Sequence, residues 1–138
     1  MNWLSIRFPL SSADIQKLEQ KLDVELPRDY AEQIGPINGA ALKNARIIIP
    51  SLGEVPYCRN VPLHKDARAG IFDLVNIFNP GAITLFPFGA VGNGDYFCFD
   101  LSAGTVVLYL HELQTTMYVC DTFTQLLSLL VQDDPNIP

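Results

Sequence analysis

Basic residues are missing from the second half of this sequence. All nine Lys and Arg lie at or before Arg68, whereas acidic residues continue to the end: Asp73, Asp95, Asp100, Glu112, Asp121, Asp133 and Asp134. The formal net charge is −6. An anionic field repels phosphate backbones, so we expect no nucleic-acid partner. The same field attracts cationic partners, although acidic residues also serve simply to keep a protein in solution.

Long apolar runs and cysteine motifs are missing as well. No apolar run approaches the roughly 20 residues that a transmembrane helix needs, so we expect no membrane partner. The first residues lack the basic region and apolar stretch of a signal peptide. Cys58, Cys98 and Cys120 are far apart, with no Cys-x-x-Cys pair, a pattern typical of free thiols in a reducing compartment. We therefore expect a cytoplasmic protein.

What is present indicates a folded domain. The 138 residues are 49% apolar, which is the size and composition of one domain with its own core. Ten prolines and nine glycines are spread along the chain rather than clustered, which indicates many turns. We expect residues 1–138 to form a single domain, as a monomer or weak homodimer.

The first half of the sequence alternates short helical and extended patterns. Apolar residues at helical spacing predict a helix over residues 13–23, capped by Ser12. Pro27 suits the first position of a second helix. Further along, the patterns predict a helix over 27–34 ended by Gly35-Pro36, a turn at Asn38-Gly39, a strand over 46–49, a loop over 50–62 with a brief strand at 57–61, and a helix over 66–78.

The second half predicts a sheet. Four strands are expected at residues 83–88, 96–101, 105–111 and 115–120. Their loops are short, so consecutive strands must be antiparallel neighbours. The sequence Thr122-Phe123-Thr124-Gln125 fits a capping box that opens a last helix over 123–132. The predicted fold is therefore α+β: a mainly antiparallel sheet with a central four-strand meander and about four helices packed around it.

Alternation along the central strands separates two faces. One face, with Phe97, Phe99, Val106 and Leu108 among its members, is apolar, so it must lie under helices. The other face carries Tyr96, Asp100, Tyr109 and His111, and we expect it to be at least partly wet. Tyrosines beside acidic residues are common at protein interfaces. The alternative is that these tyrosines fill a second small core and expose only their hydroxyls.

The sequence gives little support for a catalytic site or a metal-binding site. Cys98 and His111 lie on the same face of adjacent strands and could form a nucleophile–base pair, but no residue supplies an orienting group or oxyanion site. The spacing of Cys98, His111 and Cys120 matches no zinc template. The segment Gly89 to Gly94 lacks the Lys-Ser/Thr of a phosphate loop. Asp95 is expected to accept hydrogen bonds within its own turn. We expect no enzyme, no metal and no cofactor.

Several short motifs occur in a familiar order: Leu26-Pro27-Arg28-Asp29-Tyr30, Asn38-Gly39, Phe86-Pro87-Phe88-Gly89, Gly92-Asn93-Gly94-Asp95-Tyr96, Gly104-Thr105 and Thr122-Phe123. Over residues 13–131 this order resembles the SUKH superfamily, in particular the branch related to the fungal cell-wall-assembly regulator. Ala40 departs from the pattern, which has a second glycine there. The resemblance implies an α+β fold. In bacteria it implies an immunity protein that binds and neutralises a cognate polymorphic or contact-dependent toxin, often a nuclease.

The resemblance also suggests where function resides. Its signature falls on Leu26, Pro27, Tyr30, Asn38, Gly39, Gly89, Gly94, Asp95 and Asp100, of which only the two aspartates have functional potential. Together with the wet face, this predicts a partner-binding surface made of Asp95, Tyr96, Asp100, Tyr109, His111 and Glu112. The expected partner is a cationic toxin domain. The alternative is a regulatory or scaffolding interaction module with an endogenous partner, as in the fungal relatives.

Overall fold

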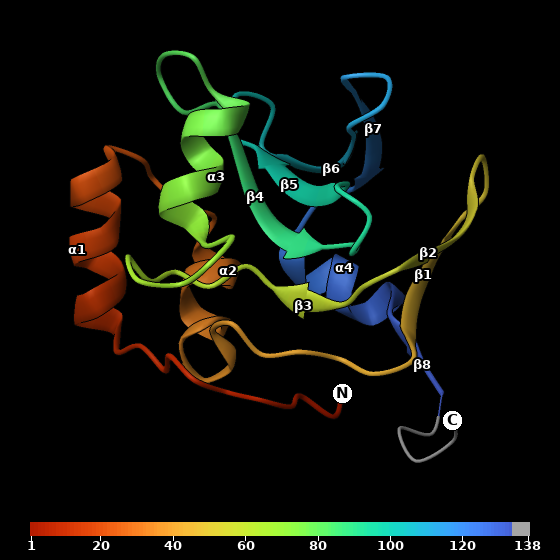
Figure 1. The fold of residues 1–138 in the computed structure, drawn as a ribbon, viewed down its shortest axis with the longest axis horizontal. Coiled ribbons are helices and arrows are strands. Elements are labelled where there is room, and N and C mark those ends of the chain that lie inside the picture. The colour runs from red at the N-terminus through yellow and green to blue at the C-terminus, as the bar shows by residue number, and fades with distance from the viewer. Residues whose placement is uncertain (134–138) are drawn as a thin grey trace.

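A five-stranded antiparallel sheet is the centre of the fold (Figure 1), in a computed structural model that describes residues 1–133. Its strand order is β3-β4-β5-β6-β7. These strands are β3 (Arg59–Asn60), β4 (Leu85–Ala90), β5 (Tyr96–Asp100), β6 (Thr105–Leu110) and β7 (Thr115–Cys120). The four-strand meander from β4 to β7 confirms the predicted centre of the sheet, and β3 adds a short strand at the β4 edge.

A second, three-stranded antiparallel sheet lies to one side, with strand order β2-β1-β8 (Figure 1). It comprises β1 (Ala45–Ile49), β2 (Gly53–Pro56) and β8 (Val131–Gln132). The β1 strand was predicted, but β2 and β8 were not. The β2 strand was missed because it begins with glycine and ends with proline, which are typical of loops. The β8 strand was missed because its two residues continue the apolar spacing of the last helix.

The helices are α1 (Ser12–Leu22), α2 (Arg28–Gln33), the 3-10 helix η1 (Gly35–Ile37), α3 (Ile71–Phe78) and α4 (Phe123–Leu129). They cover both faces of the large sheet. On one face, the Tyr30 ring of α2 packs against Phe99 of β5 and Phe123 of α4, with ring centroids 4.8 and 5.1 Å away. On the other face, Phe78 of α3 packs against Tyr96 and Tyr109. None of the helices described is long and apolar enough to span a membrane.

The two faces of the large sheet differ in exposure, as expected. The apolar face is buried as predicted, with Phe97 fully inaccessible and Phe99 only 2% exposed. The other face is partly wet at its ends, where Asp100 is half-buried and His111 is exposed, but Cys98 and Val107 at its middle are only 0% and 6% exposed. Tyr96 and Tyr109 beside them are half-buried. Phe78 of α3 packs against both tyrosines and limits their exposure.

Several element ends differ from the expectation. Ser11, not Ser12, caps α1, and its hydroxyl and the Asp14 carboxylate form a reciprocal capping box. The α3 helix begins at Ile71 rather than residue 66, because Ala69 has φ of 49° and Gly70 is extended. The last helix ends at Leu129, since extended Leu130 leads directly into β8. These ends depend on backbone conformations that apolar spacing does not reveal.

The Asn38-Gly39 turn exists, but Asn38 does not take positive φ. Asn38 has φ −60° and ψ 126°, and Gly39 has φ 72°, which are the values of a type II turn. The Asn38 side chain is buried: its Nδ2 donates to Phe8 O at 2.8 Å, and its Oδ1 accepts from Leu63 N at 2.9 Å. Asn38 therefore joins the N-terminal segment to the chain around residue 63.

Gly89 is required by a close approach inside the sheet. The Tyr57 ring crosses directly over it, so that a Cβ at position 89 would lie 2.7 Å from Tyr57 Cζ and Oη. Tyr57 itself cannot move aside easily, because it is fully buried and its hydroxyl donates to Asn60 Oδ1 at 2.7 Å. The glycine in β4 is thus fixed by the packing of a tyrosine from another segment.

This contact predicts a difference between two glycine substitutions. Gly89→Ala forces the added methyl into the Tyr57 ring and should lower the free energy of unfolding by about 2 kcal/mol or more. Gly81→Ala is the matched control, because a Cβ there meets nothing within 4 Å, and it should change stability by less than about 0.5 kcal/mol. Urea denaturation measures both. Equal stability of the two variants would contradict this role of Gly89.

Candidate functional site

The hairpin of β5 and β6 carries the predicted partner-binding residues, but at its two ends. Tyr96 pairs with Tyr109 at one end, next to Asp95 and His111. Asp100 pairs with Thr105 at the other end. Three strand residues separate Tyr96 from Asp100, a distance of about 13 Å. The predicted surface is therefore divided into two groups.

At the first end, Asp95 is held by His111. Asp95 Oδ1 accepts a hydrogen bond from the His111 backbone amide at 2.9 Å and lies 2.5 Å from the Nδ1 atom of its ring. Gly94 makes room for this ring, because a Cβ at position 94 would lie 3.1 Å from His111 Nδ1. The Asp95 side chain is 14% exposed. This carboxylate builds the corner of the hairpin and turns little of its surface outward.

The pKa of Asp95 reflects this environment. Burial alone raises the pKa of this carboxyl, but the hydrogen bonds from the His111 amide and ring, and the charge of that ring, outweigh burial and leave the pKa below its ordinary value of 3.8. The folded protein thus favours the ionised carboxylate more than the unfolded chain does.

Around this corner lies a partly exposed aromatic cluster. Tyr109 and Tyr96 are half-buried against Phe78, whose ring centroid lies 4.6 Å from that of Tyr109 and 5.6 Å from that of Tyr96. Two apolar side chains from the neighbouring elements are more open: Ile77 is 75% and Leu113 73% exposed. Glu112 lies in the exposed turn beside Leu113. This end therefore offers apolar surface with one acidic side chain.

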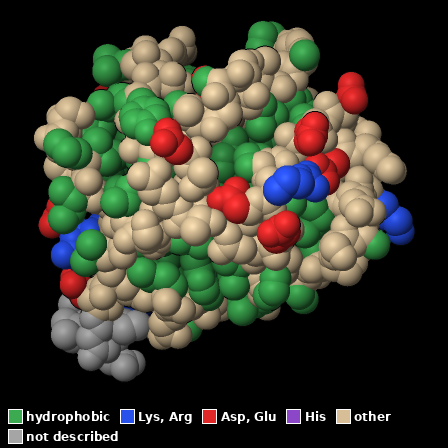
Figure 2. Space-filling view, turned by 180° about the vertical axis from the view of Figure 1, so that it is seen from behind, with side chains coloured by type: hydrophobic (Ala, Val, Ile, Leu, Met, Phe, Trp, Pro, Cys, Tyr) green, Lys and Arg blue, Asp and Glu red, His purple; other side chains and the backbone are tan. Residues whose placement is uncertain are grey.

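At the second end, Asp100 lines a hollow of about 430 Å³ between the starts of α2 and α4 and the turn that joins β5 to β6. We call it the acidic hollow. Its lining includes the carboxylates Glu25, Asp29, Asp100 and Asp121, the guanidinium of Arg28, and the apolar residues Leu26, Pro27, Phe99, Leu101 and Phe123. Figure 2 shows acidic side chains gathered around a basic one, with hydrophobic side chains between them, on the face behind that of Figure 1.

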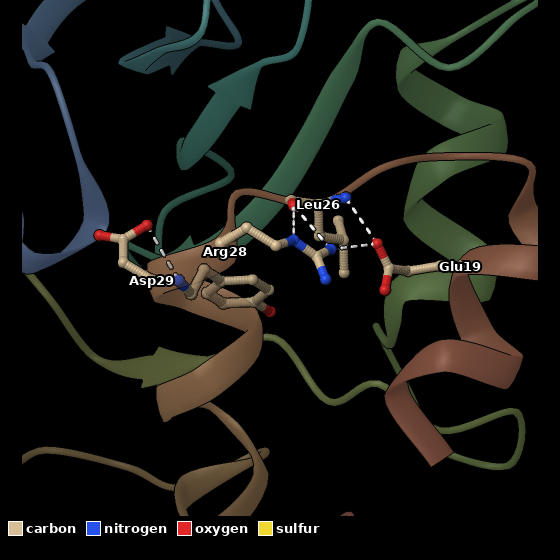
Figure 3. Close-up of polar contacts among 5 residues, drawn as sticks. Glu19, Leu26, Arg28 and Asp29 are labelled. Atoms are coloured by element: carbon tan, nitrogen blue, oxygen red, sulfur yellow. Dashed lines mark hydrogen bonds and ion pairs between the residues drawn. The ribbon is translucent and has the colours of Figure 1, made fainter. Parts of the chain in front are cut away.

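Two charged residues of the hollow have structural partners. Arg28 donates to the Leu26 carbonyl from Nη2 at 2.9 Å and forms an ion pair with Glu19 of α1, which in turn accepts from the Leu26 amide at 2.9 Å (Figure 3). On the opposite side of α2, Asp29 Oδ2 accepts from the Thr124 amide at 2.8 Å and from its hydroxyl at 2.9 Å. Asp29 therefore ties α2 to the first turn of α4.

The remaining carboxylates are less constrained. Asp100 Oδ1 accepts from the Ser102 and Ala103 amides at 3.1 Å, which shapes the turn. Asp121 Oδ1 accepts from the Tyr118 hydroxyl at 2.6 Å, and its side chain is exposed. Glu25 is exposed at the rim. These three carboxylates supply the negative charge that the hollow turns outward.

Sequence reasoning identified only Asp100 among the residues of the hollow. Glu25, Asp29 and Asp121 come from segments far from it in the chain, and only folding brings them together. Of these three residues only Asp121 lies in the acidic second half, and that acidity did not single it out. The Leu26-to-Tyr30 motif contained Asp29, although nothing in the motif indicated that its carboxylate would reach α4.

The structure also places the cysteine and histidine candidates. Cys98 is fully buried and pairs with Val107, and burial raises the pKa of its thiol well above the ordinary value. The Cys98 thiol contacts the Tyr96 carbonyl, whereas the His111 ring contacts Asp95. Within residues 1–133, no group of three or more His, Cys, Asp or Glu side chains is arranged to hold a metal ion. That the protein is not an enzyme stays a prediction.

Helices packed on both faces of a mainly antiparallel sheet define an α+β domain, and its open acidic hollow is a concave surface with an apolar floor. The chain belongs to the SMI1 / KNR4 family (SUKH-1), whose sequence model matches residues 9–129. This confirms the resemblance seen in the motifs. Neither the curated proteins nor the solved structures contain a significant match to this chain.

The Asp95 contacts predict a pH-dependent contribution to stability. Because the folded pKa lies below 3.8, the contribution is complete above the unfolded value and is lost as the pH falls through the folded value. Asp95→Asn should therefore lower the free energy of unfolding by about 1 kcal/mol at pH 6, and by much less at pH 3. Urea denaturation at both pH values measures this.

The control for this experiment is Glu112→Gln, which removes a charge from the same corner at an exposed position. It should change stability little at either pH. If Asp95→Asn destabilised the protein equally at pH 6 and pH 3, its effect would come from something other than the ionised carboxylate.

Proposed function

We propose that this protein is an immunity-type protein of bacteria, which binds and neutralises a cognate toxin domain through the acidic hollow. The toxin is cationic on the surface that it presents, and a nuclease is the class that fits best. The observation that carries the proposal is the hollow itself, in which three outward carboxylates surround an apolar floor. Membership of the SUKH-1 family supports the role of a protein-binding module.

The chemistry of the hollow favours a basic side chain as its occupant. Glu25, Asp100 and Asp121 attract a Lys or Arg, whose aliphatic stem can lie along the apolar floor while its charge stays near the rim. Arg28 does not cancel this attraction fully, because it is already paired with Glu19. A nuclease needs basic residues to hold phosphates, so an acidic hollow is complementary to the surface that such a toxin uses for its own substrate.

Charge distribution over the whole chain supports the same orientation. The β5–β6 turn and the segment after β7 contain no Lys or Arg, because none follows Arg68, and the hollow that they line has one basic residue, Arg28, against four acidic ones. An uncompensated negative field steers a cationic partner toward this region and raises the association rate. Binding should therefore weaken as salt is added.

The test is co-expression with the toxin encoded beside the gene. The double variant Asp100→Asn/Asp121→Asn keeps the side-chain oxygens that accept in the native contacts and removes only the charge. It should bind the toxin about tenfold more weakly at low salt and protect growth less well than the wild type does. Growth curves and binding titrations at two salt concentrations measure both effects.

The matched control is Asp73→Asn, which removes an exposed charge from the first turn of α3. It should protect as the wild type does. If the double variant protected growth fully and bound the toxin with unchanged affinity, the claim that the toxin binds at the acidic hollow would be wrong. Lack of protection by the wild type itself would contradict toxin neutralisation and favour a regulatory module with an endogenous partner.

A further inference from the structure

The β7 strand is an open edge of the large sheet. Among residues 1–133, its hydrogen-bonded neighbour is β6 on one side, and β7 is the last strand in the order (Figure 1). The opposite edge is different, because β3 is bridged at Arg59 by Ala41, and Ala41 by Leu4. An edge strand directs the N–H and C=O groups of alternate residues away from the sheet.

The composition of β7 does not protect this edge. Proteins usually block exposed edges with charged residues, proline, bulges or inward-pointing charges. The register shifts where β6 pairs with β7, so that Val119 has no partner in β6 and the regular part of the edge is residues 115–118. The six residues from Thr115 to Cys120 contain no charged residue, proline or glycine. Threonine, valine and tyrosine, which make up most of this strand, favour extended structure. Tyr118 is 60% exposed, and Thr115 and Thr116 are exposed as well.

The position of β7 connects the two groups of candidate residues. It begins just after Glu112 and Leu113, at the aromatic end of the β5–β6 hairpin. It ends just before Asp121, which lines the acidic hollow. The Tyr118 hydroxyl donates to Asp121 at 2.6 Å, so the strand and the hollow share a contact. The two ends that the hairpin separates are thus joined along this edge.

We propose that β7 pairs with an extended segment of the partner protein, which adds a further strand to the sheet. The segment has about six uncharged residues with strand propensity and a basic residue at each end. Backbone hydrogen bonds to the regular part of the β7 edge, residues 115–118, hold its middle. Its basic ends meet Glu112 and Asp121. This inference rests on the proposed function in one respect: it takes the partner protein to be the toxin.

Charge argues against a second copy of this chain as the occupant. Each copy carries a net charge of −6. Two β7 strands paired around a two-fold axis bring the acidic residues that flank them close together, and like charges at an interface are unfavourable. A segment with basic ends replaces this repulsion with attraction at both ends. The edge therefore selects a partner of opposite charge.

A synthetic peptide tests the edge without the toxin. The probe is an octapeptide with lysine at both ends and six alternating valine and threonine residues between them. It should bind with a dissociation constant on the order of 0.1–1 mM and slow the hydrogen exchange of β7 amides, read residue by residue by NMR. The matched control peptide carries N-methyl groups on alternate amides along one edge, and it should not bind.

Variants separate charge from backbone pairing. Glu112→Gln/Asp121→Asn should weaken binding of the lysine-ended peptide about tenfold at low salt, with no change for the same peptide bearing neutral ends. Asp73→Asn should affect neither. Protection at β2 instead of β7, or equal binding of the N-methylated peptide, would overturn the proposal. Protection of β7 that grows with protein concentration alone would assign the edge to a second copy and also overturn it.

The two proposals fail separately. The peptide replaces the toxin, so a negative titration leaves toxin neutralisation standing. Failure of the co-expression experiment, in turn, leaves peptide binding at β7 unaffected.

Discussion

The packing of Tyr30 is the contact on which the rest of the structure depends. Its ring is fully buried and lies against Phe86, Phe88, Phe99 and Phe123, which come from β4, β5 and α4. Its hydroxyl is the one buried side-chain polar atom in residues 1–133 without a hydrogen-bond partner. Such an atom costs about 1–3 kcal/mol, so burial of the aromatic surface must outweigh that cost.

The residue before Tyr30 completes the connection. Asp29 bonds to Thr124 at the start of α4, so two consecutive residues of α2 hold α4, one through apolar packing and one through hydrogen bonds. On the other side of α2, Arg28 and Glu19 fix the approach from α1. The acidic hollow lies between the starts of α2 and α4 and the β5–β6 turn, and its shape follows from how these residues place the two helices.

The sequence predicted the meander well and its surroundings less well. The strand-favouring residues of the segment located β7 correctly at residues 115–120. The start of α3 was misplaced. The apolar spacing of residues 71–78 predicts a helix, but it does not reveal that Ala69 before it has a positive φ. The β8 strand was missed because two residues carry no period, and its pairing with β1 is a tertiary contact.

The candidate site was predictable in type but not in arrangement. Alternation placed Asp100 and Tyr96 on one face, which is correct, yet it could not show that the middle of that face, at Cys98 and Val107, is buried and separates its two ends. The Asp95 carboxylate was expected to accept hydrogen bonds within its own turn, but it accepts from His111 across the hairpin, and within the turn the Asp95 amide donates to Asn93 Oδ1. Glu25 and Asp121 join Asp100 only through the placement of α2 and α4.

These placements suggest a division of roles among the acidic residues. The carboxylates of Asp95 and Asp29 accept hydrogen bonds that stabilise the fold. Such residues are expected in a motif that a whole family shares. Glu112 and Asp121 lie at the ends of an uncharged edge strand and face outward, so they suit recognition. A protein that must match one partner can vary such outward residues without disturbing the packing around Tyr30.

Hydrogen exchange of the complex with the neighbouring toxin tests the central claim most directly, namely that the partner occupies the hollow and the adjoining β7 edge. The account predicts that protection on binding is confined to residues 100–105 and 115–121 and to the start of α2, with α3 and the β1–β2 hairpin unchanged. Protection centred on α3, with β7 exchanging as in the free protein, would contradict it.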